Sequence, residues 1–320
     1  MGARLASQRG RRTTAQHHAT PATTTVAPAT HTTATYGAMN YRHAFHAGSF
    51  ADVVKHAVLA RILVHLRAKP AAFRVIDTHA GAGLYDLAGA EASRSGEWRD
   101  GIGRLIAASV AEPVRALLSP YLDVVAGLNA GGRLATYPGS PALARAFLRA
   151  QDRLVACELE PNAAAALAGN VEHDRRVKVV AIDGWIALNA YVPPPERRGV
   201  VLIDPPFEDA GDFTRLARGL ETAHRKWAGG IFLLWYPIKG REAPDTLARR
   251  LRRAGIAKIL RAELAVAPTH TEGPLGGCGL IVVNPPWTLE SELQAVLPAL
   301  AAVLAGQGGG HRLDWLVAES

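Results

Sequence analysis

Residues 73–83, FRVIDTHAGAG, decide the fold of this sequence. The first five letters are short, apolar and rich in β-branched residues, which predicts a buried strand. The strand runs straight into Gly81-Ala82-Gly83, where glycines let the backbone turn tightly and pass close to a nucleotide. Such a strand and turn are typical of the first unit of an α/β nucleotide-binding sheet, although a GxG alone fits a simple turn equally well.

Further apolar runs follow this first strand. Those expected as strands cover residues 153–158, 177–183, 199–204, 230–236, 257–264 and 279–284. Helical patterns cover residues 51–68, 140–151, 161–172, 213–227 and 243–254. Strands alternating with amphipathic helices predict an α/β, Rossmann-like domain with a seven-stranded, mostly parallel sheet.

The connection after the glycine turn is too long for a simple crossover. About 70 residues separate Gly83 from the second strand, whereas such connections usually need far fewer. Residues 101–130 have a helical composition, so we expect a helical insertion at about 84–135. It interrupts a single catalytic domain that spans residues 39–320.

The N-terminal tail has a different composition. Residues 1–38 are rich in Thr, Ala, His and Pro and contain no acidic residue, so we expect a disordered extension. An organellar transit peptide is an alternative, and so is an over-called start that leaves Met39 as the first residue. Four arginines of this tail supply half of the formal net charge of +8. The remainder is mildly basic, which permits an RNA partner.

Cysteine usage and hydropathy favour a cytoplasmic protein. Cys157 and Cys278 each lie in an apolar run, so we expect two reduced, buried thiols. No apolar stretch approaches the roughly 20 residues that span a bilayer, and no secretory signal is present. We therefore expect no membrane association, and we expect a monomer.

Two carboxylates at strand ends indicate the cofactor. Glu158 ends the second strand, and Asp183-Gly184 ends the third. A carboxylate at the second strand can accept hydrogen bonds from both ribose hydroxyls, and one at the third can accept from an adenine amine. A dinucleotide enzyme needs only the former, placed about 20 residues after the glycines. The pair predicts S-adenosylmethionine.

The motif Asp204-Pro205-Pro206-Phe207 at the end of the fourth strand carries the chemistry. Asp204 and the Pro205 carbonyl can each accept one hydrogen of an exocyclic amine, while Phe207 stacks on the base. Holding both hydrogens directs the nitrogen lone pair toward a methyl donor. The chain is therefore expected to be an amino-group methyltransferase, in which Asp204 also accepts the proton. A strand-ending Pro-Pro turn is the simpler alternative.

A second Pro-Pro turn, Asn284-Pro285-Pro286-Trp287, is similar to the NPPY form of other amino-group methyltransferases. No further strand is expected after it to complete a sheet. We therefore interpret it as an ending turn with Trp287 in the core.

The segment from Tyr41 to Gly48, YRHAFHAG, is followed by Asp52, Lys55 and His56. Its aromatic and cationic groups could stack on a base and contact phosphates. Core or capping roles remain open for any single histidine. A metal site is not expected, because the histidines at 43, 46, 56 and 79 lack a compact ligand spacing.

Taken together, several motifs resemble the RlmJ family of 23S ribosomal RNA adenine-N6 methyltransferases. They are YRHAFHAG, ADVVKH, DTHAGAG, YPGSP at 137–141, ELEP at 158–161, DPPF, LWYP at 234–237 and VNPPW at 283–287. The resemblance runs from Met39 to the C-terminus. Family members begin near the YRH motif, and Phe207 stands where Tyr is commoner.

The resemblance implies a Rossmann-like S-adenosylmethionine-dependent methyltransferase that modifies adenine 2030 of 23S ribosomal RNA. It implies that Asp204 is catalytic, that Tyr41 approaches the RNA, and that His43 and Lys55 assist. The residues implied at or around the cofactor are His56, His79, Ser140, Glu158, Asp183, Gly184 and Asp204. A DNA adenine-N6 or cytosine-N4 methyltransferase is the main alternative, and a non-catalytic RNA-binding assembly factor is the other.

Overall fold

The computed structural model describes residues 42–209, 211–268, 275–305 and 308–319. The tail of residues 1–38 and Tyr41 lie outside the described residues, so the predictions made for them stay predictions. Residues from Asn40 to Ser320 form one compact unit. Among the described helices, none combines the length and the apolar character that crossing a membrane requires.

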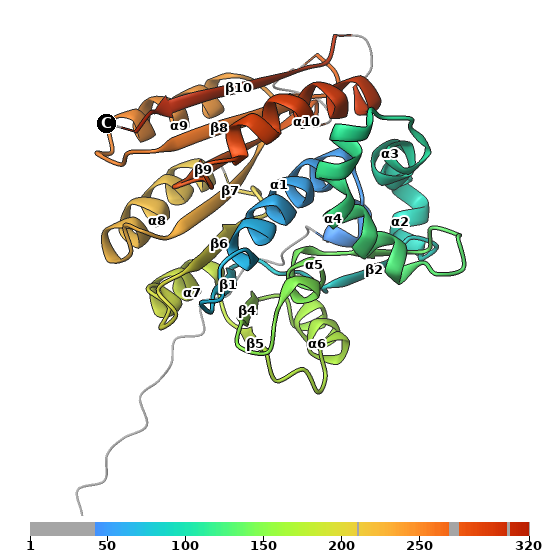
Figure 1. The fold of residues 1–320 in the computed structure, drawn as a ribbon, viewed down its shortest axis with the longest axis horizontal. Coiled ribbons are helices and arrows are strands. Elements are labelled where there is room, and N and C mark those ends of the chain that lie inside the picture. Colours follow the sequence, from blue (N-terminus) through green and yellow to red (C-terminus); the bar gives the residue numbers. More distant parts are fainter. Residues whose placement is uncertain (1–41, 210, 269–274, 306–307, 320) are drawn as a thin grey trace, which may run out of the picture. The chain divides into compact units, whose positions relative to one another are not determined.

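One large sheet organises this unit (Figure 1). Its strand order is β10-β8-β9-β7-β6-β1-β4-β5. The strands are β1 (Arg74–Asp77), β4 (Arg153–Glu158), β5 (Val177–Ala181), β6 (Gly199–Ile203), β7 (Ile231–Ile238), β8 (Ile259–Ala265), β9 (Gly277–Val283) and β10 (Gly310–Val317). Neighbours from β5 to β7 pair in parallel, whereas β9 is antiparallel to both β7 and β8. The predicted α/β, mostly parallel sheet is confirmed.

The predicted number of seven strands was wrong, because the described sheet has eight. β10 pairs antiparallel with β8 at the sheet edge. Its sequence, GHRLDWLV, alternates polar and apolar residues from Arg312 to Trp315, as a half-exposed edge strand does. The expectation that no strand follows Asn284 was therefore also wrong.

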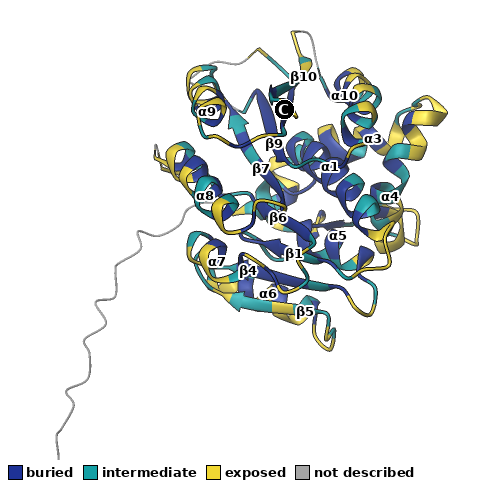
Figure 2. Cartoon of the chain, turned by 60° about the vertical axis from the view of Figure 1, so that its left-hand side comes forward, coloured by how far each residue is buried: buried dark blue, intermediate teal, exposed yellow. Residues whose placement is uncertain are grey.

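Helices cover both faces of the sheet. One core packs helices α1 (Phe50–Arg67), α5 (Ser140–Phe147), α6 (Pro161–Asn170) and α10 (Leu289–Leu304) against it. The other core includes α7 (Gly184–Tyr191), α8 (Asp212–Lys226) and α9 (Glu242–Arg252). Strands are buried between the layers, and the helices expose their outer surfaces (Figure 2). α1 is an exception, because most of its length is buried.

The region between β1 and α5 contains its own small elements. A two-stranded sheet pairs β2 (Leu84–Asp86) with β3 (Thr136–Pro138). Between these strands lie α2 (Ala90–Ser95), η2 (Arg99–Gly103), α3 (Arg104–Ala107) and α4 (Glu112–Leu128). Treating this region as an inserted subdomain remains our interpretation.

Candidate functional site

Four acidic residues lie at the carboxyl ends of neighbouring parallel strands, which form one edge of the sheet. β6, β1, β4 and β5 are consecutive, parallel neighbours, so their carboxyl ends lie side by side. Asp204 follows β6, Asp77 ends β1, Glu158 ends β4 and Asp183 follows β5. This edge is also where the strand order reverses, because β4 and β6 flank β1 on opposite sides. Open α/β sheets bind ligands at such a point.

The glycine turn after β1 is tied to Glu158. Gly81 and Gly83 have φ values of 62° and 82°, which favour glycine. The Gly81 amide donates to Glu158 Oε2 at 2.8 Å, and the Glu160 amide donates to Oε1 at 2.8 Å. Each carboxylate oxygen keeps a further lone pair for a ligand hydroxyl. Glu158 thus anchors the glycine turn and still has free lone pairs on its carboxylate oxygens that can accept hydrogen bonds from a ligand.

Asp183 caps helix α7 with one oxygen. Its Oδ1 accepts from the amides of Trp185 at 2.9 Å and Ile186 at 3.0 Å. In the described chain its Oδ2 makes no hydrogen bond, so an acceptor remains for an amine. A Cβ on Gly184 would come within 2.4 Å of the Thr78 carbonyl oxygen. Only glycine therefore fits at this position.

The neutral histidine His79 stands beside two of these carboxylates. Burial lowers the pKa of His79 to about 4, against the pull of the carboxylates of Asp204 and Asp183. His79 Nδ1 lies 2.8 Å from the Thr78 hydroxyl. Since both carboxylates act on His79, the groups at the ends of β6, β1 and β5 are within electrostatic reach of one another.

His56 is fully buried on α1. Its Nδ1 lies 2.8 Å from the Tyr137 hydroxyl, which in turn lies 2.9 Å from the Tyr121 hydroxyl. Burial lowers the pKa of His56 to about 3, so the ring is neutral. Its Nε2 is buried and has no partner among the described residues. A buried polar atom without a partner is costly unless a ligand satisfies it.

Ser140 is linked to Asp77, which the sequence places at the start of the DTHAGAG motif but for which no role of its own was predicted. Its hydroxyl donates to Asp77 Oδ2 at 2.6 Å. Asp77 is 0% exposed, and burial raises its pKa to about 7. The signal was present, since Asp77 ends the first strand just as Glu158 ends the second.

A buried ion network connects Asp204 to helix α1. Lys55 Nζ lies 2.5 Å from Asp204 Oδ2 and 2.9 Å from Asp52 Oδ1. Asp52 Oδ2 in turn lies 3.0 Å from His43 Nε2 and accepts from the Gly48 amide at 3.0 Å. Burial disfavours the Lys55 ammonium. The carboxylates of Asp204 and Asp52 outweigh this effect and hold the pKa of Lys55 well above the usual value. The network fixes the orientation of the Asp204 carboxylate.

Asp52 is a second residue that the sequence reasoning did not single out as a site residue. Its burial disfavours the carboxylate, yet His43 and Lys55 hold its pKa well below the usual value. The spacing of three residues between Asp52 and Lys55 on one helix was the available signal.

The DPPF turn is packed on its aromatic side. Phe207 has a φ of 53°, and its ring centroid lies 4.9 Å from that of Phe213 and 5.7 Å from that of Trp235. Pro205 is buried. Asp204 Oδ1 makes no hydrogen bond in the described chain, so one acceptor is left beside the Pro205 carbonyl.

The NPPW turn lies where the parallel strands begin, at the opposite end of these strands from the candidate site. Because β9 is antiparallel to β7, Val283 pairs with Phe232 near the start of β7. The Asn284 side-chain Nδ2 donates to the carbonyls of Ala228 at 2.7 Å and Gly230 at 2.8 Å. The expectation that Trp287 packs in the core was wrong, since it is 86% exposed. Leu289, fully buried, fills the core where α10 begins.

The two thiols follow their prediction. Cys157 and Cys278 are both free and buried. In the described part of the chain, no group of three or more metal-ligating side chains is arranged to hold an ion.

Comparison with known proteins adds the family context. A family model described as ribosomal RNA large subunit methyltransferase D, RlmJ, matches residues 70–317. Ribosomal RNA large subunit methyltransferase J of Escherichia coli is 41% identical over 282 residues, 88% of this chain and 100% of that protein. The Haemophilus influenzae protein of the same name is 38% identical over 283 residues, with the same coverage of both chains.

A solved structure agrees with the sequence relatives. The crystal structure of protein LPL1258 from Legionella pneumophila superposes with a TM-score of 0.77 at 34% identity. The match covers 84% of this chain and 98% of that chain.

Proposed function

Because this chain belongs to the RlmJ family of ribosomal RNA large subunit methyltransferases, we propose that it methylates the N6 amine of adenine 2030 in 23S ribosomal RNA with S-adenosylmethionine. The observation that carries the proposal is the position of Asp204. Its carboxylate stands at the same sheet edge as Glu158 and Asp183, and a buried lysine fixes it there.

The residues at this edge fit S-adenosylmethionine. Glu158 faces the glycine turn with lone pairs for the ribose hydroxyls, and Asp183 Oδ2 is open to the adenine amine. Gly184 lets the Thr78 carbonyl and the His79 ring lie against the start of α7, where a Cβ would clash with both. His56 Nε2 offers a buried polar atom without a partner. When bound, the cofactor supplies an electrophilic methyl group on sulfur.

The chain's own contribution to the chemistry is to hold an amine. Asp204 Oδ1 and the Pro205 carbonyl oxygen each accept one N–H, which matches the two donors of adenine N6. This draws the nitrogen lone pair out of the purine ring and points it for in-line attack. Asp204 then takes the proton that the methylated nitrogen loses. Lys55 keeps the carboxylate in position throughout.

The substrate side of the site is proposed to include His43, Lys55, Phe207 and, from the undescribed segment, Tyr41. Phe207 presents an aromatic ring next to Asp204, where an adenine extruded from its stack can lie. Ser140 and His79 complete the surroundings of the cofactor, because Ser140 bonds to Asp77 and His79 stands by Gly184.

A methyl-transfer assay tests the substrate. Labelled S-adenosylmethionine is offered with 23S ribosomal RNA, with duplex DNA, and with RNA fragments in which 2′-deoxynucleotides flank the target. We expect transfer to RNA at N6 of a single adenine, located by mass mapping. Transfer to DNA alone would favour the DNA methyltransferase alternative, and binding of RNA without transfer would favour the assembly factor.

The variant Asp204→Ala tests the mechanism. We expect transfer to fall below detection while cofactor affinity changes only a few-fold, because the main contact of Asp204 is with the target amine. Affinity is measured calorimetrically with S-adenosylhomocysteine. Wild-type turnover in this variant would remove Asp204 from the mechanism.

A further inference from the structure

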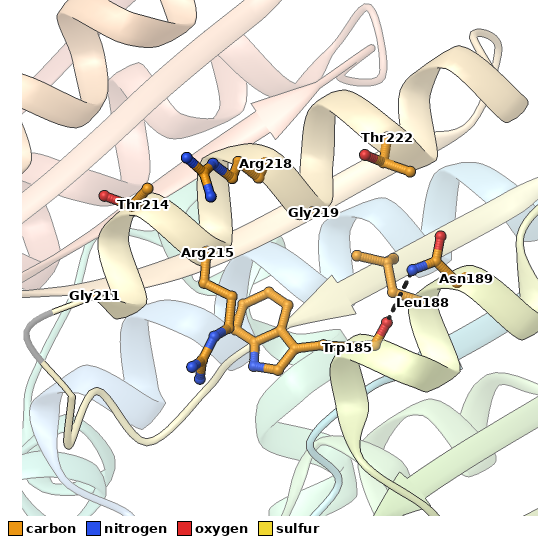
Figure 3. A pocket seen from close by; sticks show the side chains of 9 residues that line it. All are labelled: Trp185, Leu188, Asn189, Gly211, Thr214, Arg215, Arg218, Gly219 and Thr222. Carbon is orange, nitrogen blue, oxygen red and sulfur yellow. Dashed lines mark hydrogen bonds between the residues drawn. The ribbon is translucent and has the colours of Figure 1, made fainter.

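Helices α7 and α8 leave an open groove between them (Figure 3). Its volume is about 510 Å³, within the range of about 300–1,000 Å³ typical of small-ligand sites. Trp185, Leu188 and Asn189 line it from α7, and Arg215, Arg218 and Thr222 line it from α8. None of these residues belongs to the methyl-transfer machinery described above.

The groove starts beside the candidate site. Trp185 directly follows Gly184, and its ring lies 5.4 Å from that of His79 in an edge-on arrangement. On the other wall, Phe213 at the start of α8 contacts Phe207 of the DPPF turn. Both helices begin at the carboxyl edge of the sheet. A strand of nucleic acid that delivers a base to Asp204 would therefore pass this end of the groove.

The groove carries a fixed aromatic surface. A Cβ on Gly219 would come 3.2 Å from the Trp185 ring and 3.1 Å from Leu188, so the indole lies directly against α8. Trp185 is still partly exposed. An indole held in one orientation is a good stacking platform for a nucleobase, because little side-chain entropy is lost on binding.

Two exposed arginines lie one helical turn apart on the same wall. The Arg215 guanidinium lies 5.9 Å from the Trp185 ring centroid and 3.1 Å from Asp212 Oδ1. Arg218 makes no hydrogen bond or ion pair among the described residues. The nearby carboxylate of Glu221 is engaged by Arg250 at 2.8 Å. Arg218 thus offers a positive charge whose neighbouring acid is already engaged, which suits a phosphate. The charge of Arg215, in contrast, is shared with Asp212 and, at 3.8 Å, with Asp209.

We propose that this groove binds the single-stranded RNA next to the target adenine, with one base stacked on Trp185 and a backbone phosphate at Arg218. The inference rests on the proposed function, because it assumes that RNA is the substrate. Stacking on an aromatic ring combined with arginine–phosphate contacts is the usual chemistry of single-strand RNA binding.

A matched pair of arginine variants tests the phosphate contact. Arg218→Ala removes a groove arginine, and Arg225→Ala removes another exposed arginine of α8, which donates to Thr222 but does not itself line the groove. Binding of a 23S fragment is measured over a series of salt concentrations. We expect Arg218→Ala to weaken binding several-fold and to lower the slope of log Kd against log salt by about 0.7, the value for one phosphate contact on a single strand. Arg225→Ala should leave the slope unchanged.

Trp185 variants test the stacking. Trp185→Ala should raise the KM for RNA about ten-fold at saturating cofactor, and Trp185→Phe should restore most of the loss because it keeps a π face. The kcat at saturating RNA and the affinity for S-adenosylhomocysteine should stay near the wild-type values, which separates this role from the neighbouring cofactor site.

The outcomes distinguish this inference from the proposed function. If wild-type enzyme methylates 23S RNA but Arg218→Ala matches Arg225→Ala in Kd and salt slope, the groove inference is overturned while the function stands. If the wild-type enzyme transfers no methyl group to RNA, the proposed function itself fails.

Discussion

The DPPF turn at 204–207 and the NPPW turn at 284–287 have similar sequences but lie at opposite ends of the parallel strands. β6 runs parallel to β1, so Asp204 reaches the edge with Glu158 and Asp183. β9 runs antiparallel to β7, so Asn284 emerges at the other edge, where the parallel strands begin. Strand direction therefore decides whether such a motif can meet a cofactor.

The two turns also differ in backbone and in side-chain use. The left-handed residue is the aromatic Phe207 in the first turn but the leading Asn284 in the second, with φ values of 53° and 51°. Asparagine tolerates that conformation better than phenylalanine. Asp204 keeps a carboxylate oxygen open, whereas Asn284 uses its amide to tie down two backbone carbonyls. The DPPF turn presents a carboxylate oxygen that stays free among the described residues, whereas the NPPW turn anchors two backbone carbonyls.

Substitutions at Asp204 and Asn284, the leading residues of the two turns, should have the largest difference in effect. Asp204→Asn keeps the shape but removes the charge that accepts the proton and pairs with Lys55, so kcat should fall by about 10²–10⁴-fold. Asn284→Asp should leave kcat within about two-fold, because it lies at the other edge. Single-turnover methyl transfer measures both, and comparable losses in the two variants would contradict the assignment.

Two buried aspartates at opposite ends of the parallel strands should make contributions to stability that change oppositely with pH. The folded pKa of Asp77 is about 7, above the unfolded value of about 3.9, so its share of stability is present below about pH 4 and lost as pH rises toward 7. Asp77→Asn should therefore gain stability relative to wild type over that window, by up to about 4 kcal/mol at about 1.4 kcal/mol per unit.

Asp152, before β4, is the matched control for Asp77. It is 0% exposed; burial opposes its charge, but Arg149 and the Phe73 amide lower its pKa. Its contribution is present above the unfolded pKa and lost as pH falls, so Asp152→Asn should lose stability at pH 7 relative to wild type. Urea unfolding at pH 3, 4, 5.5 and 7 measures both variants, and parallel pH trends would contradict the prediction.

Ion pairs near the two turns should differ in strength. Lys55 is 4% exposed, so Lys55→Met leaves the Asp204 carboxylate without its cation. Asp52 then keeps only His43 and the Gly48 amide among the described residues, so the substitution should cost about 3 kcal/mol. Lys258, whose carbonyl accepts from the Asn284 amide, pairs with exposed Glu319. Lys258→Met should cost no more than about 0.5 kcal/mol. Equal changes in the free energy of unfolding would show that burial is not the deciding factor.

The smallest effect is expected at the aromatic ends of the turns. Trp287 is largely exposed, so Trp287→Ser should change the free energy of unfolding by less than about 0.5 kcal/mol. Phe207→Ser removes a ring packed on Phe213 and Trp235 and should cost about 1–2 kcal/mol. A clear loss for Trp287→Ser, measured by urea unfolding, would indicate that its indole is covered in solution.

Local pattern predicted much of the fold and part of the site. β4 occupies the expected residues 153–158, because a buried parallel strand is a continuous apolar run that can be recognised without its neighbours. β10 was missed because an edge strand is half polar and depends on the partner that it joins. The pairing of Lys55 with Asp204 was missed for a similar reason, since 149 residues separate them.

The sequence by itself determined the chemical inventory of this protein: the glycine turn, the acids that end successive strands, and a carboxylate before a rigid Pro-Pro. These follow from local steric and hydrogen-bonding preferences of neighbouring residues. Tertiary structure alone decided which Pro-Pro turn faces Glu158 and Asp183, and which aspartate is desolvated enough to hold a proton. Strand direction and burial arise from contacts between distant segments, so no local pattern encodes them.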